Sequence, residues 1–229
     1  MKFSLLAFVA LGANAAFANP VSDSTSSPNG KLKLTAATLR ESVAGGKSGA
    51  FAPDGTELPR SLVLERRWSG PVCESMLENR GKLPVKVGSI VLSEFRHGLA
   101  EATPIYGEGF TMLSQTGGTL GKPSDQGFLT DRTHYRIPEP GARTTVYGMM
   151  TLRPSADRAA LIGFTSCKRF AGRISFDKET LSISLDAEGL VLEPGAKWNL
   201  EPLRVDEGPD RNTLLDSLAS DLARQHPPI

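Results

Sequence analysis

Residues 180–186 read Thr-Leu-Ser-Ile-Ser-Leu-Asp, and this stretch decides the fold class. Leu181, Ile183 and Leu185 alternate with polar residues, so that every second side chain is apolar. Successive side chains of a strand point to opposite faces of its sheet, and this period of two is typical of a strand with one buried face. The stretch therefore predicts a β-strand in a sheet that is covered on one side and open to water on the other.

Similar short runs occur on both sides of this stretch, separated by turns that contain glycine, proline or charged residues. The runs are residues 61–67, 72–78, 84–92, 144–153, 160–167, 173–176, 190–195 and 197–205. A spacing of roughly 8–12 residues between strands is typical of antiparallel sheets that stack on each other. We therefore expect a mainly β fold, an antiparallel β-sandwich.

Two details of this fold can be predicted from the turns. Residues 72–78 and 84–92 flank a turn at Asn79-Arg80-Gly81, and if they pair, residues 79–83 form a hairpin loop of ordinary length. Residues 103–142 contain many glycines and few strand signals. They predict a long, loop-rich insertion, and such insertions often carry function.

The C-terminal region predicts an amphipathic helix. Leu214, Leu218 and Leu222 recur every four residues, which places them in one apolar stripe. Asp210 is suited to cap the first turn, and Pro227-Pro228 ends the helix. Because the stripe needs a cover, we expect the helix to pack on the sandwich or on another polypeptide.

The N-terminal region predicts export. Lys2 precedes a mostly apolar run, and Ala16-Phe17-Ala18 is a small-x-small cleavage pattern, so we expect a signal peptide cleaved after Ala18 and a secreted or periplasmic protein. The polar segment that follows is expected to be flexible. The expected organisation is thus a signal peptide, a flexible segment, a β-sandwich, and a helix with a domain-boundary tail, over residues 1–18, 19–59, 60–207 and 208–229.

The cysteines leave two alternatives open. An oxidising compartment permits a disulfide between Cys73 and Cys167, and two buried free thiols fit their apolar surroundings equally well. No Cys-x-x-Cys and no histidine pair at ligand spacing occurs in the sequence, so we expect neither a metal site nor a cofactor.

The overall charge narrows the range of partners. Lys plus Arg is 26 and Asp plus Glu is 25, which gives a net charge of +1. Such a balance provides no electrostatic drive toward a phosphate backbone or an anionic membrane. We therefore expect neither nucleic acid nor membrane as a partner.

Two short segments of the glycine-rich region are candidates for ligand binding. Tyr106, Glu108 and Phe110 place a carboxylate between two glycines and two aromatic rings, a combination that suits a sugar or another domain. A turn that buries both rings in the core is the structural alternative. The second segment could form a polar binding strip or a surface strand edge, and its candidate residues are Asp131, Arg132, His134 and Tyr135.

The order of several motifs is familiar. The strand before Asn79-Arg80-Gly81 is followed by Pro84 to Val87, Tyr106 to Phe110, Asp131 to Tyr135, Ile162 to Ser166, Leu192 to Gly195, Trp198 to Pro202, and finally the helix before Pro227-Pro228. This order resembles the N-terminal β-sandwich domain of the α-galactosidase-like glycoside hydrolases of family 36, over roughly residues 60–229. The resemblance implies a supersandwich of the galactose-mutarotase-like kind.

In that family a (β/α)8 barrel follows the sandwich and carries both catalytic aspartates. No residue of this chain matches the barrel motifs, so the resemblance implies no catalytic residue here. It implies instead a carbohydrate-contacting or accessory role beside a galactoside or a catalytic barrel domain or partner chain, in a truncated or split hydrolase or a stand-alone sandwich. The oligomeric state stays open.

Two other functions remain open at this point. A sugar mutarotase-like enzyme would need one acid and one base, for which His97 or His134 with Glu108 are the candidates. A protein-interaction module would use the region 103–142 and the C-terminal helix to bind another polypeptide.

Overall fold

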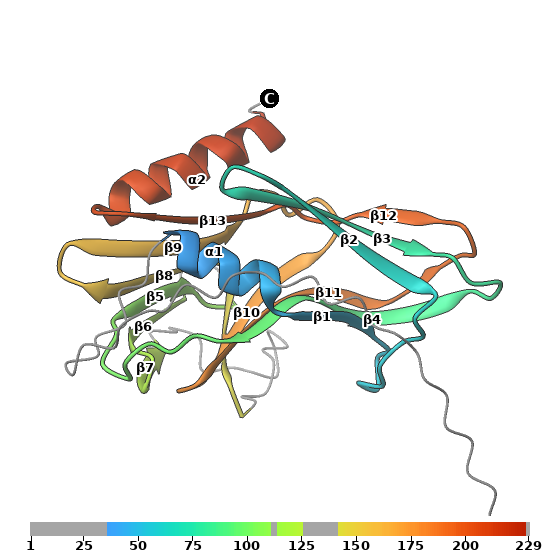
Figure 1. Ribbon diagram of the computed structural model, residues 1–229, viewed down its shortest axis with the longest axis horizontal. Coiled ribbons are helices and arrows are strands. Elements are labelled where there is room, and N and C mark those ends of the chain that lie inside the picture. Colours follow the sequence, from blue (N-terminus) through green and yellow to red (C-terminus); the bar gives the residue numbers. More distant parts are fainter. Residues whose placement is uncertain (1–35, 111–113, 126–141, 228–229) are drawn as a thin grey trace, which may run out of the picture. The chain divides into compact units, whose positions relative to one another are not determined.

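The computed structural model describes residues 36–110, 114–125 and 142–227, and these residues form a mainly β fold (Figure 1). Every strand pairing among them is antiparallel. The predicted antiparallel sandwich with a C-terminal amphipathic helix is confirmed. The predicted signal peptide lies outside the described residues.

Hydrogen bonding joins the strands into one sheet that folds over into two layers. The first layer consists of β1 (Lys47–Phe51), β4 (Val85–Arg96), β11 (Thr180–Leu192), β10 (Ala171–Phe176) and the first part of β8 (Thr144–Ser155). The second layer continues from the last part of β8 through β9 (Arg158–Phe164), β13 (Leu203–Gly208) and β3 (Val72–Asn79), which is flanked by β12 (Lys197–Asn199) and β2 (Leu62–Ser69).

The core lies between these layers. Leu181, Ile183 and Leu185 of β11 are each 0% exposed, as their alternation predicts. They belong to the same apolar cluster as Leu77 of β3 and Ile162 of β9. Burying an aliphatic side chain of this size stabilises a fold by about 1.5–3 kcal/mol, so this cluster provides the main driving force for joining the layers.

Strand β8 passes from one layer to the other at Gly148. Residues 144–147 pair with β10, whereas the pairing with β9 begins at Met149. Gly148 has a φ of 71°, a backbone conformation that glycine adopts without a steric penalty. The register of the neighbouring strand shifts opposite this point, between Gly107 and Glu108.

The glycine-rich region 103–142 contains more regular structure than expected. Its described part forms β5 (Ile105–Glu108), β6 (Gln115–Thr119) and β7 (Lys122–Asp125), and β5 pairs with β8. The expectation of a loop-rich insertion is therefore wrong for these three strands. Cross-strand pairing to β8 orders a segment whose composition predicts little regular structure.

Residues 72–78 and 84–92 do not pair with each other, so they form no hairpin. β3 pairs with β2, β12 and β13, whereas β4 pairs with β1 and β11. The connection crosses between layers, and the buried Asn79 stabilises it. Its Nδ2 donates to the carbonyls of Leu83 and Leu192, each at 2.9 Å, and its Oδ1 accepts from the Gly81 N–H at 2.9 Å.

A helix that the sequence analysis missed lies within the segment expected to be flexible. Helix α1 (Ala36–Gly45) buries Leu39 and Val43, each 1% exposed, in the main core. The Arg66 guanidinium donates to the carbonyls of Val43 at 3.1 Å and Ala44 at 2.8 Å, which satisfies carbonyl groups that the helix end leaves open. The flexible segment predicted over 19–59 is thus wrong for α1 and β1, while its first part lies outside the described residues.

Helix α2 (Arg211–Gln225) is the predicted C-terminal helix. Asp210 caps it, and Leu214 and Leu218 pack against Ala159 and Leu161 on the outer face of β9. A Cβ on Gly163 would lie 2.7 Å from a Leu218 methyl group, so glycine at this position allows the close approach. No helix in the part of the chain that the structure describes is long and apolar enough to span a membrane.

The two cysteines are free thiols. Cys73 is buried on β3, and Cys167 is exposed in the loop after β9. The disulfide alternative is therefore wrong, and the alternative of two buried thiols holds only for Cys73. Cys167 is exposed because it lies just beyond the last paired residue of its strand, Phe164.

Candidate functional site

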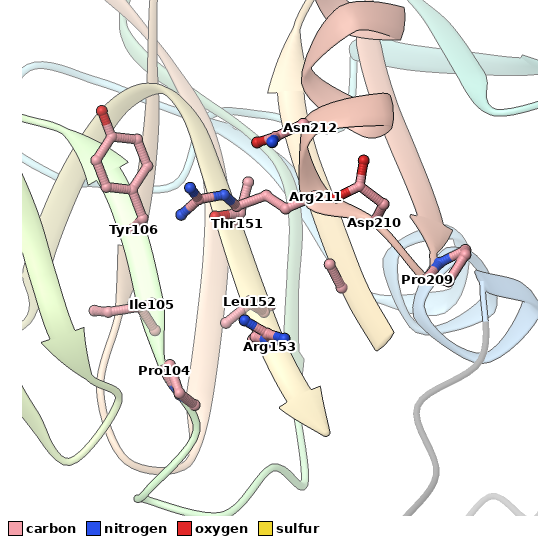
Figure 2. Close-up of a pocket in the computed structure, with 11 residues that line it drawn as sticks. Pro104, Ile105, Tyr106, Thr151, Leu152, Arg153, Pro209, Asp210, Arg211 and Asn212 are labelled. Atoms are coloured by element: carbon pink, nitrogen blue, oxygen red, sulfur yellow. The ribbon is translucent and has the colours of Figure 1, made fainter. Parts of the chain in front are cut away.

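A pocket with a volume of about 330 Å³ lies where β5, β8 and β9 meet the start of α2 (Figure 2). Its lining residues are Pro104, Ile105, Tyr106, Thr151, Leu152, Arg153, Ala159, Pro209, Asp210, Arg211 and Asn212. Tyr106, one of the predicted candidates, provides its aromatic surface. The combination of one ring with several polar groups is typical of sites for small polar ligands.

Arg211 and Tyr106 form the centre of this pocket. Arg211 extends from the start of α2 toward Tyr106, and its guanidinium carbon lies 5.6 Å from the ring centroid (Figure 2). At this distance a guanidinium is attracted by the negative face of an aromatic ring. The contact joins α2 to β5.

The other polar groups of the pocket come from both of its sides. Arg153 lies near the end of β8, directly after the buried Leu152, and one of its Nη atoms donates to the Ala156 carbonyl at 2.8 Å. Asn212 follows Arg211 on α2. The pocket therefore presents guanidinium and amide groups, which can donate hydrogen bonds to the oxygens of a ligand.

Asp210 is the carboxylate of the pocket, and it serves the helix. Its Oδ2 accepts from the Thr213 N–H at 3.0 Å and from the Thr213 hydroxyl at 2.9 Å. The backbone hydrogen bond from Thr213 is the largest of the effects that lower the pKa of Asp210. The group therefore remains ionised at neutral pH and stabilises the N-terminus of α2.

Glu108 and Phe110 lie outside this pocket, beside Tyr147. Glu108 is exposed and pairs in register with Tyr147, and the Phe110 ring packs edge-on against the Tyr147 ring with centroids 5.3 Å apart. Phe110 is 44% exposed, so the structural alternative of two core aromatics is wrong for this ring. The shift in register at Gly148 separates Glu108 and Phe110 from Tyr106.

Polar residues of β10 and β11 border this second aromatic group. Arg173, which pairs in register with Tyr147, forms an ion pair with Asp186. Burial raises the pKa of the Tyr147 hydroxyl, and the two charged neighbours act in opposite directions on it. The sequence motif from Tyr106 to Phe110 thus contributes to two separate surface features.

Of the other predicted candidates, four lie outside the described residues, and His97 has a structural role. Asp131, Arg132, His134 and Tyr135 lie outside the described residues. His97 is 5% exposed; its Nδ1 accepts from the Leu99 N–H at 3.0 Å, and its Nε2 lies 3.1 Å from the Asp177 carbonyl oxygen. Both ring nitrogens of His97 therefore contact backbone groups, and the ring stabilises a loop rather than facing a ligand.

Glu201 is a buried acid with a structural role. It accepts a hydrogen bond from the Ser166 hydroxyl and from the N–H groups of Arg169 at 2.7 Å and Phe170 at 3.1 Å. Burial would raise its pKa, but these hydrogen bonds outweigh burial and lower it. Glu201 is thus an ionised anchor for the loop after β9.

Arg153 and Arg211 are the charged pocket residues that sequence analysis missed, and Thr151 and Asn212 are polar ones that it also missed. Only the position of Arg211 directly after a helix cap could have drawn attention to it. Among the residues that the structure describes, no group of three or more His, Cys, Asp or Glu side chains could hold a metal ion. A second hollow of about 540 Å³ is formed by residues of β2, β3 and β12, and it contains none of the predicted candidates.

Fold and site together define a mainly antiparallel β-sandwich with a small polar and aromatic pocket on its surface. The comparison with solved structures finds weak similarities. An alpha-galactosidase from Thermus thermophilus in complex with p-nitrophenyl alpha-D-galactopyranoside matches with 12% identity and a TM-score of 0.38, over 76% of this chain and 31% of that chain. The same enzyme in complex with stachyose matches with 12% identity and a TM-score of 0.38, over 78% and 33%.

A third similar structure is a protein from Escherichia coli K12 assigned as an aldose 1-epimerase. It matches with 14% identity and a TM-score of 0.33, over 63% of this chain and 60% of that chain. This chain spans about a third of the length of the alpha-galactosidase chains, 31% and 33%. No family model and no curated protein matches the sequence.

Proposed function

We propose that this protein binds a carbohydrate in the pocket between β5, β8, β9 and α2. The observation that carries the proposal is the pocket of about 330 Å³, in which the Tyr106 ring lies among the side chains of Thr151, Arg153, Arg211 and Asn212. The volume is at the lower end of the range for ligand pockets, and it suits one sugar unit rather than a long chain.

The chemistry of the lining matches that of a saccharide. A pyranose has apolar C–H groups, which pack against an aromatic ring, and hydroxyl groups, which need hydrogen-bond partners. Tyr106 supplies the ring, whereas Arg211 and Asn212 supply donors from the helix. The Asp210 carboxylate adds an acceptor.

We propose further that the role is accessory and that catalysis belongs to a barrel domain or a partner chain. Glycoside hydrolysis commonly uses two carboxyl groups on opposite sides of the scissile bond. Asp210 is the single carboxylate among the lining residues of this pocket, and it is engaged with Thr213.

Binding is tested by calorimetry on the purified chain with galactose and methyl α-galactoside. Tyr106→Leu removes the ring and should weaken binding, whereas Phe110→Leu makes the same change outside the pocket and should leave binding unchanged. Loss of binding in Phe110→Leu alone would move the site to the surface near Tyr147. Absence of binding to any saccharide would overturn the proposal.

The accessory role is tested with a nitrophenyl α-galactoside. We expect the chain to release nitrophenol no faster than the double variant Glu108→Gln, Asp131→Asn. Turnover well above that of the double variant would identify an enzyme. Export is part of the proposal, and sequencing of the mature N-terminus should give Asn19 if the signal peptide is cleaved after Ala18.

A further inference from the structure

The pocket carries an excess of positive charge. Arg153 and Arg211 bring two guanidinium groups to its lining, against the single carboxylate of Asp210. Two partly buried arginines elsewhere are paired with acids: Arg143 contacts Glu94 at 2.8 Å, and Arg204 contacts Asp221 at 2.7 Å, whereas Arg211 is exposed. Among the residues that the structure describes, Arg211 forms no ion pair, and its guanidinium faces the Tyr106 ring.

The position of Arg211 makes its charge unfavourable for the helix itself. It is the first residue of α2, where the helix dipole favours negative side chains and disfavours positive ones. The adjacent acid, Asp210, is directed toward Thr213 and satisfies the helix end. The charge of Arg211 makes only the smallest of the contributions that lower the pKa of Asp210, and Arg211 forms no salt bridge with the described residues, so its guanidinium is available to a ligand in the pocket.

We propose that the carbohydrate bound in this pocket is anionic, and that Arg211 recognises its acidic group. This inference rests on the proposed function. A guanidinium presents donors in a planar fork, which matches the geometry of a carboxylate or a sulfate. Because the guanidinium carbon is 5.6 Å from the Tyr106 centroid, a sugar ring in contact with the tyrosine is within reach of the arginine.

Arg153 contributes to the same preference from the opposite wall. One of its Nη atoms is engaged with the Ala156 carbonyl, and this contact holds the guanidinium at the end of β8. A second positive charge raises the local concentration of anions and weakens the binding of cations. The pocket is therefore expected to prefer a uronic acid or a sugar sulfate to the neutral sugar of the same configuration.

The test compares three sugars that share the galactose configuration: galactose, galacturonic acid and galactose 6-sulfate. Calorimetry at low ionic strength should show binding of galacturonic acid at least about tenfold tighter than that of galactose, the effect of one charge-assisted contact. Arg211→Gln should remove this difference, because it should weaken the binding of galacturonic acid more than that of galactose. Arg60→Gln, an exposed arginine outside the pocket, is the matched control.

The outcomes separate this inference from the proposed function. Equal affinity for galactose and galacturonic acid, unchanged by Arg211→Gln, would overturn the anionic preference and leave carbohydrate binding in place. Binding of none of the sugars would overturn both. Tighter binding of the sulfate with the same dependence on Arg211 supports the inference and identifies a sulfated ligand.

Two further measurements guard against a trivial loss of binding. Since a positive charge at the start of a helix is unfavourable, Arg211→Gln should unfold at the same temperature as the parent or at a higher one. Added salt should weaken the binding of galacturonic acid to the unmodified protein and leave galactose unaffected, because salt screens the charge interaction. Binding of galacturonic acid that is insensitive to salt would contradict the role of the arginine charge.

Discussion

The two helices lie on opposite faces of β13, and they are attached to the sheet in different ways. α1 contacts β13 and β4 and places Leu39 and Val43 in the main core between the layers. α2 contacts β13 and β9 from outside and forms a separate, smaller apolar cluster with Leu214 and Leu218. The first helix covers part of the main core, whereas the second packs on the outer face of the second layer.

Charged contacts reinforce this difference. Asp221 of α2 accepts hydrogen bonds from Arg204 of β13 at 2.7 Å and from Arg224, and its side chain is 7% exposed. Buried charge pairs of this kind fix the position of a helix on a sheet more than they increase the stability of the fold. Because the position of α2 on the sheet is fixed, its first turn can line the pocket beside β5, β8 and β9.

The largest effect should come from truncating the inner helix. Leu39→Ala removes a side chain that is 1% exposed and leaves a cavity in the main core, which should cost about 2–5 kcal/mol of the free energy of unfolding. Leu218→Ala makes the same change in the outer cluster and should cost about 2 kcal/mol, since the helix can shift to fill part of the space. Urea unfolding of both variants is the measurement, and a larger loss in Leu218→Ala would refute the comparison.

The next effect concerns the ion pair between Asp221 of α2 and Arg204 of β13. Asp221→Asn removes the charge that faces Arg204 and leaves that guanidinium, 13% exposed, with Asp206 at 2.6 Å as its remaining carboxylate. We expect a loss of about 1–3 kcal/mol in the free energy of unfolding. Asp216→Asn, on the exposed side of the same helix, is the matched control and should have no measurable effect. Equal losses in the two variants would show that the buried pair has no special role.

The helices also show what a sequence can predict. α2 has a cap and three leucines at a spacing of four, so its local pattern was sufficient. α1 offers only Leu39 and Val43, and two glycines follow at 45 and 46. Its stability comes from the core and from Arg66, whose contacts span 22 and 23 residues along the chain. No local pattern contains that information.

The candidate site follows the same rule. Tyr106 was predicted from its own segment, whereas Arg211 reaches it only because α2 returns to the sheet beside β5. Glu108 and Phe110 were expected beside Tyr106, but the change of register opposite Gly148 places them next to Tyr147. The sequence could predict which residue types suit a sugar, while the topology determines which of them share a pocket.

A smaller effect, opposite in sign, is expected on the inner face of β13. The Glu207 side chain is 1% exposed; its oxygens lack hydrogen bonds from the described residues, and Arg158 approaches only to 3.4 Å. Burial raises its pKa, and the nearby Asp206 raises it further, while Arg158 opposes both. A carboxyl with a raised pKa in the folded protein stabilises the fold at pH values below its ordinary pKa, and this contribution is lost as the pH rises through the folded-state pKa.

Glu207→Gln should therefore be more stable than the parent at pH 7, and the difference should shrink as the pH falls toward 4. Free energies of unfolding measured across this range test the expectation. Glu193→Gln, an exposed glutamate in the loop after β11, should follow the pH dependence of the parent. A variant at position 207 that is less stable at pH 7 would mean that the ionised carboxylate is stabilised by its surroundings.

The last prediction concerns the reactivity of the two cysteines, which compares the buried core directly with the exposed surface. Cys73 is 2% exposed on β3, and burial raises the pKa of its thiol, so it should resist alkylation. Cys167 is exposed beside the end of α2, where its N–H donates to His226 Nε2 at 3.3 Å. One thiol per chain should react in the native protein and a second only after unfolding, whereas no reactive thiol in either state would reveal a disulfide. Because Cys73 belongs to the core that α1 closes, Leu39→Ala should accelerate its labelling more than Leu218→Ala does.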